Sequence, residues 1–138
     1  MTSFFIPFNT PSSKNSKQWT GKFLTSSKNT HLWRKLTEPH WVKFKSEFLK
    51  ELENLPKPYN IEFTFVRKSK HKFDYVNPLQ TVLDEMVKHG WLADDNCDEV
   101  KPFFGDYIYN KENPGVYIEI LDFKSFKDFK EIFKNSKK

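Results

Sequence analysis

The stretch Tyr59–Gly90 reads YNIEFTFVRKSKHKFDYVNPLQTVLDEMVKHG and contains the patterns of one strand and one helix. In its first part, Tyr59–Arg67, apolar and polar residues alternate, so that Ile61, Phe63 and Phe65 fall on one side. Such alternation is typical of a strand with one buried face. We therefore expect a sheet strand here, followed by a short basic connection.

The second part of the stretch has the three- and four-residue spacing of an amphipathic helix. Its expected buried stripe consists of Leu79, Val82, Leu83, Met86 and Val87. We expect Asn77 to be the N-cap, with Pro78 at the first helical position and Gln80 completing a capping box. Gly90 is expected to end the helix, because glycine is the usual residue after a helix C-terminus.

The rest of the chain adds a mixture of strands and helices. Asn29–Leu36 predicts a short helix, and Thr37 is expected to cap a second helix that opens with Pro39 and runs to about Asn54. Pro11–Trp19 is expected to be a polar loop. Further strands are expected at Ser3–Phe8, Gly21–Thr25, about Val100–Tyr109 and Val116–Leu121. This order predicts a two-layer α+β domain, a mixed β-sheet with helices packed mainly on one face.

The composition suits one domain, residues 1–122, followed by a lysine-rich tail, residues 123–138. The tail carries Phe126, Phe129, Ile132 and Phe133 at helical spacing, which predicts an amphipathic helix that docks on the body or on a second subunit. Cys97 is the only cysteine, which excludes an internal disulfide and a thiolate zinc site. We expect no signal peptide or membrane span, and a cytoplasmic location.

Charge is distributed unevenly along the chain, whose formal net charge is +5. Residues 1–37 contain six Lys or Arg and no acid, and Arg67–Lys72 adds four more basic residues. Acids concentrate between Asp74 and Glu99. A basic protein with one acidic centre has the charge layout of a metal-dependent nuclease, in which cations hold phosphates and carboxylates hold the metal. The alternative is an ordinary solvated surface.

Aspartates flank the predicted second helix on both sides. Asp74 precedes it, and Asp94, Asp95 and Asp98 lie in the loop after it. Because Mg²⁺ binds through a few carboxylates and keeps most of its waters, two or three aspartates from separate elements suffice. They converge only if the chain doubles back, which we expect a hairpin after the loop to allow.

Two sets of residues occur at characteristic spacing. The first set consists of Lys72, Asp74 and Asn77, then Val82, Leu83 and Asp84, then Gly90, Asp94 and Asp95; the second runs from Pro11 through Asn15 to Trp19. With them the chain resembles the RusA family of Holliday junction resolvases, whose motifs are R-x-D-x-D-N-x-x-K, V-L-D, G-x-x-x-D-D and P-P-S-x-N…W. The resemblance covers roughly residues 4–120.

The resemblance implies a homodimeric, Mg²⁺-dependent endonuclease that resolves branched DNA in recombination and repair, in a bacterial or phage setting. Mn²⁺ is the expected substitute metal. The implied catalytic residues are Asp74 and Asp95; the implied metal ligands are Asp74, Asp95, Asp94 and Asp98. Asp84, Asn77 and Gln80 share one helical line and are expected to assist the ligands. The expected DNA contacts are Lys14, Asn15, Lys17, Lys70 and Lys72.

Two positions depart from the family pattern. Val76 stands where the family has its second aspartate, and Gln80 where it has a lysine. Valine cannot bind a metal, and glutamine carries no positive charge. Either Asp84 or Asp98 therefore substitutes, or the protein is a catalytically degenerate DNA-binding module. A basic scaffold for a protein partner is a third, weaker interpretation.

The remaining candidate residues have structural explanations. We expect Trp41 and Trp91 to pack in the core. His71 and His89 are expected at the surface, and Cys97 is expected to be inert.

Overall fold

The computed structural model describes residues 3–12, 17–19, 24–26 and 28–121. The elements in chain order are β1 (Ser3–Pro7), β2 (Lys17–Trp19), β3 (Leu24–Ser26), α1 (Lys28–Leu52), β4 (Tyr59–Arg67), α2 (Val76–Lys88), β5 (Val100–Phe104), β6 (Ile108–Tyr109) and β7 (Gly115–Ile120). The predicted tail, residues 123–138, lies outside the described residues, as do Lys14 and Asn15.

Strand β4 is the centre of a five-stranded mixed sheet with the order β1-β7-β4-β5, in which β6 also pairs with β4. β7 pairs antiparallel with both β1 and β4, whereas β5 and β6 run parallel to β4. The alternation in β4 has the expected effect, because Ile61, Phe63 and Phe65 are fully buried on one face. β4 has the predicted bounds.

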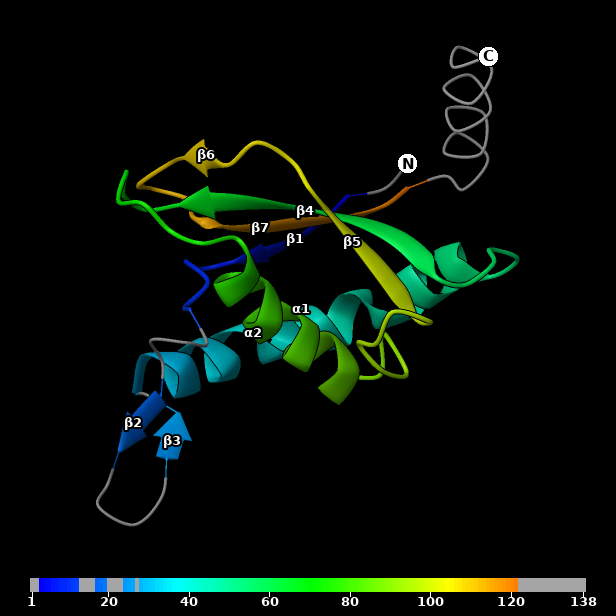
Figure 1. Ribbon diagram of the computed structural model, residues 1–138, viewed down its shortest axis with the longest axis horizontal. Helices are drawn as coiled ribbons and strands as arrows, with labels where there is room; N and C mark the ends of the chain where they lie inside the picture. Colours follow the sequence, from blue (N-terminus) through cyan, green and yellow to red (C-terminus); the bar gives the residue numbers. More distant parts are fainter. Residues whose placement is uncertain (1–2, 13–16, 20–23, 27, 122–138) are drawn as a thin grey trace, which may run out of the picture.

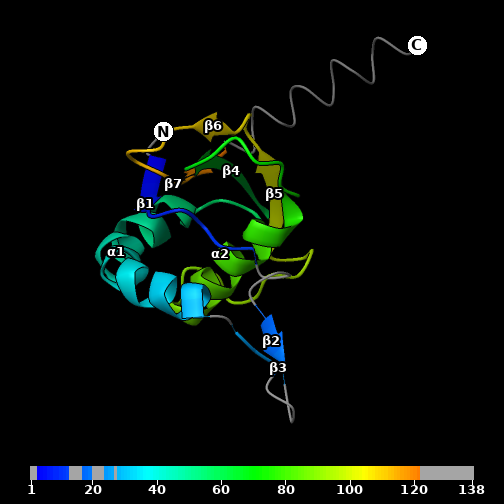
Figure 2. The ribbon, with the colours of Figure 1, turned by 90° about the vertical axis from the view of Figure 1, so that its left-hand side faces the viewer.

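Both helices lie on the same side of the sheet (Figures 1 and 2). Trp33, Trp41 and Phe48 of α1 and the apolar stripe of α2 pack against β4, β7 and β1 in one continuous core. The predicted two-layer α+β architecture with helices on one face is therefore confirmed. Within the described part of the chain, neither helix is long and apolar enough to cross a membrane.

The prediction of two separate helices before β4 is wrong, because α1 is one helix with Pro39 inside it. Thr37 lies mid-helix, where its hydroxyl donates to the Trp33 carbonyl (2.9 Å) and accepts from Trp41 Nε1 (3.0 Å). Trp33 and Trp41 anchor both halves of the helix in the core. This packing outweighs the lost backbone hydrogen bond at proline.

The predicted cap of α2 is also wrong. The residue before the helix is Tyr75, whose own backbone is already helical (φ −54°, ψ −37°) and whose side chain makes no capping bond. Asn77 lies inside the first turn, its N–H donating to the Asp74 carbonyl (3.1 Å), so it forms no capping box with Gln80. Pro78 remains tolerated there, because first-turn N–H groups have no intrahelical acceptor.

The C-terminal end of α2 is as expected at Gly90, whose φ is +78°. The Gly90 N–H donates to the Val87 carbonyl (3.1 Å) and the Trp91 N–H to the Met86 carbonyl (2.8 Å). This pair of bonds is a Schellman motif, which turns the chain sharply and seats Trp91 in the core.

Three further sequence predictions need correction. The expected loop Pro11–Trp19 ends in β2, which pairs with β3 in a separate two-stranded sheet beyond the N-terminal end of α1 (Figure 1). The expected strand Val100–Tyr109 is split into β5 and β6. Those strands form no hairpin with β7: they run parallel to β4 along one edge, with α2 as the crossover connection, while β7 pairs with the other edge.

Candidate functional site on helix α2

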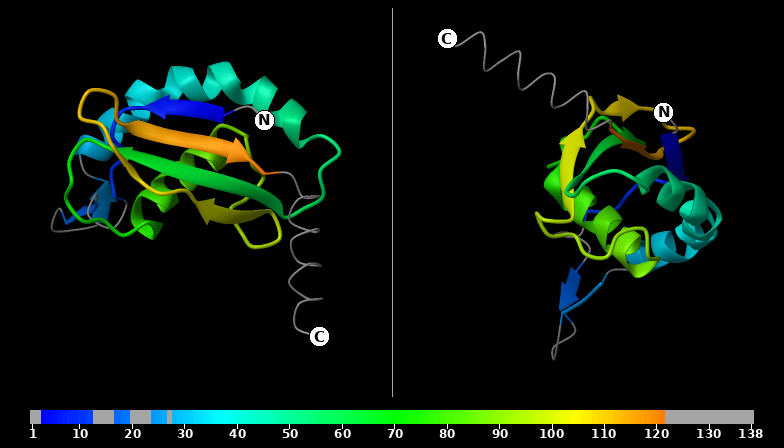
Figure 3. Two further views of the ribbon diagram at one scale, coloured as in Figure 1. Left: turned by 90° about the horizontal axis from the view of Figure 1, so that it is seen from above. Right: turned by 90° about the vertical axis from the view of Figure 1, so that its right-hand side faces the viewer.

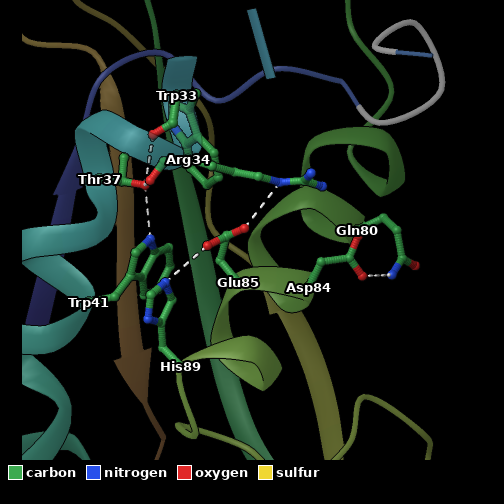
Figure 4. Close-up of polar contacts among 8 residues, drawn as sticks. All are labelled: Trp33, Arg34, Thr37, Trp41, Gln80, Asp84, Glu85 and His89. Atoms are coloured by element: carbon green, nitrogen blue, oxygen red, sulfur yellow. Dashed lines mark hydrogen bonds and ion pairs between the residues drawn. The ribbon is translucent and has the colours of Figure 1, made fainter. Parts of the chain in front are cut away.

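A polar line runs along the exposed side of α2. Asn77, Gln80 and Asp84 are three and four residues apart, so their side chains project from the same side of the helix. The Gln80 Nε2 group donates to Asp84 Oδ1 at 2.8 Å, a contact visible in Figure 4. The expected shared line is therefore present.

The loop after α2 returns to this line. Gln80 Nε2 also donates to Asp95 Oδ2 at 3.1 Å, so one amide nitrogen joins an acid of the helix to an acid of the loop. Asp84 is exposed and Asp95 half-buried. Two carboxylates thus approach each other around one neutral donor, and they do so without the expected hairpin. The tight turn at Gly90 reverses the chain instead.

Asp94 and Asp98 take part in the turn of the same loop. Asp94 Oδ1 accepts from the Asp95 N–H (2.7 Å), and Asp94 Oδ2 accepts from the Asn96 side-chain amide (3.0 Å). These two hydrogen bonds, that from the Asp95 N–H first, lower the pKa of Asp94 from its ordinary value. The Asp98 N–H donates to Asn96 Oδ1 (2.9 Å). The geometry gives Asp94 a clear turn-forming role.

Asp74 lies at the other end of the line, in a polar depression of about 270 Å³. The lining residues are Ser12, Arg67, Lys72, Phe73, Asp74, Asn77 and Pro78. Asn77 belongs both to this depression and to the polar line. At about 1.5 Å of rise per residue, Gln80 lies about 4.5 Å from Asn77 along the helix axis, and Asp84 lies about 10 Å from Asn77. The site is therefore an elongated strip.

The two cations of the depression differ in environment. Arg67 is half-buried: its Nη1 donates to the Thr10 carbonyl (2.8 Å) and its guanidinium lies 4.6 Å from the centre of the Phe73 ring. Burial lowers the pKa of Arg67 from its ordinary value. Lys72 is exposed at the rim, free of such packing within the described residues. Arg67 thus anchors the depression, and Lys72 is the cation accessible to an anionic ligand.

The structure keeps the predicted metal ligands in two groups. In the described part of the chain, no three His, Cys, Asp or Glu side chains come close enough to hold one metal ion together. Asp74 lies at the depression, whereas Asp95 meets Asp84 beside Gln80. Val76, at the family's second aspartate position, has 64 % of its surface exposed and supplies no oxygen.

The remaining candidate DNA contacts are partly described. Lys70 is exposed, and its Nζ lies 5.2 Å from the centre of the Tyr109 ring. It belongs to the same basic connection between β4 and α2 as Lys72. Lys17 lies in β2, and Lys14 and Asn15 lie outside the described residues.

A buried polar network behind the strip was not anticipated. Glu85, only 1 % exposed, forms an ion pair with Arg34 Nε (3.1 Å) and a hydrogen bond with His89 Nε2 (3.1 Å), so it joins α1 to α2 (Figure 4). The expectation that His89 is a surface residue is wrong, because its ring stacks on Trp41. The sequence signal for this network was a glutamate next to the apolar stripe of α2. Its partner Arg34 could not be inferred, because it lies far away in the sequence.

The tryptophan predictions are confirmed. Trp41 and Trp91 are buried with their rings edge to face, 5.0 Å apart, and Trp91 Nε1 donates to the Trp41 carbonyl (2.9 Å). Both indole rings therefore serve the core. Cys97 is exposed and forms no disulfide.

Comparison with known proteins adds no family to this geometry: neither the protein-family models nor the curated proteins gave a match to the chain.

Proposed function

We propose that this protein is a Mg²⁺-dependent, structure-selective endonuclease that cuts branched DNA, four-way junctions above all, in the manner of the RusA family. One observation carries the proposal. Acids from before, within and after α2 (Asp74, Asp84 and Asp95) lie along one strip beside a depression that contains Lys72. A phosphodiester substrate needs this combination, with cations for its charge and carboxylates for a metal.

The donor atoms of the strip suit Mg²⁺. Magnesium prefers carboxylate oxygens and is often bound through one or two carboxylates together with substrate phosphates. Asp84 Oδ1 and Asp95 Oδ2 both lie within 3.1 Å of one amide nitrogen, so a cation in place of that amide can contact both oxygens. Asp74 is the candidate ligand at the depression. When bound, the metal supplies an activated water and neutralises charge on the scissile phosphate.

The side chains of the chain itself position the substrate. Lys72 and Lys70 are exposed on one connection and can contact successive phosphates, which fixes register without reading sequence. Asn77 and Ser12 line the depression and offer hydrogen bonds to phosphate oxygens. Paired cutting of a four-way junction requires two such sites, so a homodimer is the proposed working form.

The test is cleavage of a synthetic four-way junction, compared with a linear duplex of the same sequence, with Mg²⁺ and with EDTA. Asp74→Asn should lower the cleavage rate by about two orders of magnitude, because a preorganised charge is removed from the site. Glu47→Gln, which neutralises an exposed acid on α1, is the matched control and should leave the rate unchanged. If wild type and Asp74→Asn are equally inactive while both bind the junction, the nuclease proposal fails.

A second candidate, a DNA-binding module without catalysis, is favoured by a separate observation. Gln80 already occupies one oxygen of Asp84 and one of Asp95, and Val76 supplies no ligand. Such a module would bind branched DNA with a steep salt dependence and without metal. Calorimetric titration with Mn²⁺ separates the two: a site-specific heat that is lost in Asp95→Asn supports the nuclease, and its absence supports the module.

A further inference from the structure

The sheet has a second face, opposite α1 and α2, that no described element covers; Figure 3 (left) looks onto it. We call it the open face. Its side chains alternate with the buried ones along β1, β7 and the middle of β4, and the strand register extends the face to β5 and β6. The open face includes Phe5, Glu62, Phe103, Ile108, Tyr117 and Glu119. An uncovered sheet face is ordinary where it is polar, so its composition decides what it does.

The open face is substantially apolar. The rings of Phe5 and Tyr117 lie 4.6 Å apart across β1 and β7. Tyr117 is 41 % exposed, and Ile108, paired with Val66 of β4, is 46 % exposed. Exposed aromatic and aliphatic side chains gathered on one sheet face mark a surface that binds another segment or molecule.

The open face also carries an unfavourable pair of acids. Glu62 of β4 and Glu119 of β7 are direct partners in antiparallel register. Like charges directly opposite across two strands are destabilising. The nearby cation, Lys101, lies over the Phe103 ring of its own strand. A basic, apolar partner would therefore complement this face in both hydrophobicity and charge.

We propose that residues 123–138 of the same chain form an amphipathic helix that docks on the open face. This segment follows β7 directly, since Leu121 still donates its N–H to the Asn60 carbonyl (2.7 Å) at the end of the sheet. Sixteen helical residues span about 24 Å, close to the length of about 20 Å of the six-residue β7. The segment contains six lysines against two acids, Asp128 and Glu131, and in a helix Lys124, Lys127, Lys130 and Lys134 would share one side beside the apolar stripe. The stripe covers Tyr117 and Phe5, and the lysines offset Glu62 and Glu119.

Two arguments favour this occupant over a second copy of the chain. A segment attached to β7 reaches the face at a high effective concentration, in the millimolar range for a short connection. A symmetric pairing of two open faces would instead enclose two Glu62–Glu119 pairs, four acids in all, in one interface. That juxtaposition of like charges opposes face-to-face dimerisation.

The experiment is hydrogen exchange of the full-length chain at several concentrations. The amides of residues 126–133 should exchange about ten-fold or more slowly than in a synthetic peptide of residues 122–138. Tyr117→Lys should return their exchange to the peptide value. Val42→Lys, which makes the same type of change at a 64 % exposed position on α1, should not. The β4 amides report in the same spectra whether each variant is folded, and Glu119→Lys is the second variant if Tyr117→Lys unfolds.

Each outcome decides the question. Protection that is independent of concentration and is lost only in the open-face variants supports docking within the chain. Protection that disappears on dilution, together with a dimer in light scattering, assigns the face to a second copy and overturns the proposal. Exchange of the tail at the peptide rate in the wild type also overturns it.

Discussion

Glu85→Gln tests whether the buried network between the two helices stabilises the fold. The Glu85 carboxylate forms an ion pair with Arg34 Nε at 3.1 Å and a hydrogen bond with His89 Nε2 at 3.1 Å, and only 2 % of its side chain is exposed (Figure 4). Glutamine keeps the shape and one acceptor oxygen. Its amide nitrogen must then face either Arg34, a donor, or His89, whose neutral ring can accept. We expect the amide to face His89, so that Arg34 retains a neutral acceptor.

The expected decrease in the free energy of unfolding can be worked out from the charged interactions that the substitution removes. A hydrogen bond to a charged group contributes about 1.5–3 kcal/mol, whereas a neutral one contributes about 1 kcal/mol. Because 29 % of the Arg34 side chain is exposed, water screens part of the ion pair, and we expect a total loss of about 2 kcal/mol. At about 3–4 °C per kcal/mol for a chain of this size, the melting temperature should fall by about 7 °C.

The assay is thermal unfolding followed by circular dichroism, with urea unfolding for the free energy. Asp84→Asn is the matched control, because it makes the same chemical change one residue earlier on the exposed side of α2. It should change the free energy of unfolding by no more than about 0.5 kcal/mol. Equal destabilisation by both variants, or an unchanged melting temperature for Glu85→Gln, would refute the reasoning.

Four further predictions concern other parts of the molecule. Gly90→Ala should lower the free energy of unfolding by about 1 kcal/mol in urea titrations, because φ is +78° at this residue. The pKa of Asp94 lies below its ordinary value of 3.8. Its contribution to the stability of the fold is therefore complete above that ordinary value and is lost as pH falls through the lower folded-state value. The difference in melting temperature between wild type and Asp94→Asn should accordingly shrink from about pH 6 to about pH 2. Lys72→Gln should reduce the slope of log K for junction binding against log salt concentration by about 0.9, measured by fluorescence anisotropy. Gln80→Ala should tighten Mn²⁺ binding about five-fold in calorimetry, since a cation at Asp95 no longer displaces the amide.

The parts of the fold that sequence predicts well are those set by local periodicity. β4 has its predicted bounds, and Leu79, Val82 and Met86 of the predicted stripe are buried. In each case the side-chain period alone decides which face is buried, and the sheet lies on that face. The end of α2 was predictable for a similar reason, because Gly90 adopts a conformation that other residues rarely adopt.

The predictions that failed depend on partners remote in sequence. Pro39 and Thr37 are typical of a helix start, but Trp33 and Trp41 both pack into the core and keep α1 continuous. Similarly, the hairpin expected after the acidic loop requires β7 to pair beside β5, whereas both strands pair with opposite edges of β4. Neither outcome can be read from a window of ten or twenty residues.

The candidate site was predictable as a set of residues but not as an arrangement. Sequence patterns select Asp74, Asp84 and Asp95, and all three border the exposed side of α2. They do not reveal that Gln80 binds two of these carboxylates at once, because that contact depends on where the loop lies after the turn at Gly90. The assignment of Gln80 to a capping box was wrong for a different reason, because α2 begins at Val76 and Asn77 lies inside its first turn.

Helix α2 stabilises the fold through its buried side and carries the candidate site on its exposed side. Asp84 and Glu85 are adjacent acids, about 100° apart around the helix axis. Asp84 is exposed and held by Gln80, whereas Glu85 is buried and held by α1. Glu85 on the buried side joins α2 to α1. On the exposed side, Asp84 and Asp95 lie close together with only the neutral amide of Gln80 between them. A lysine at position 80 would offset their repulsion internally; glutamine leaves this charge to be balanced by a cation from solution. Under the proposed nuclease function, Gln80 makes the strip depend on a bound metal for its charge balance, whereas the proposed DNA-binding module would need none.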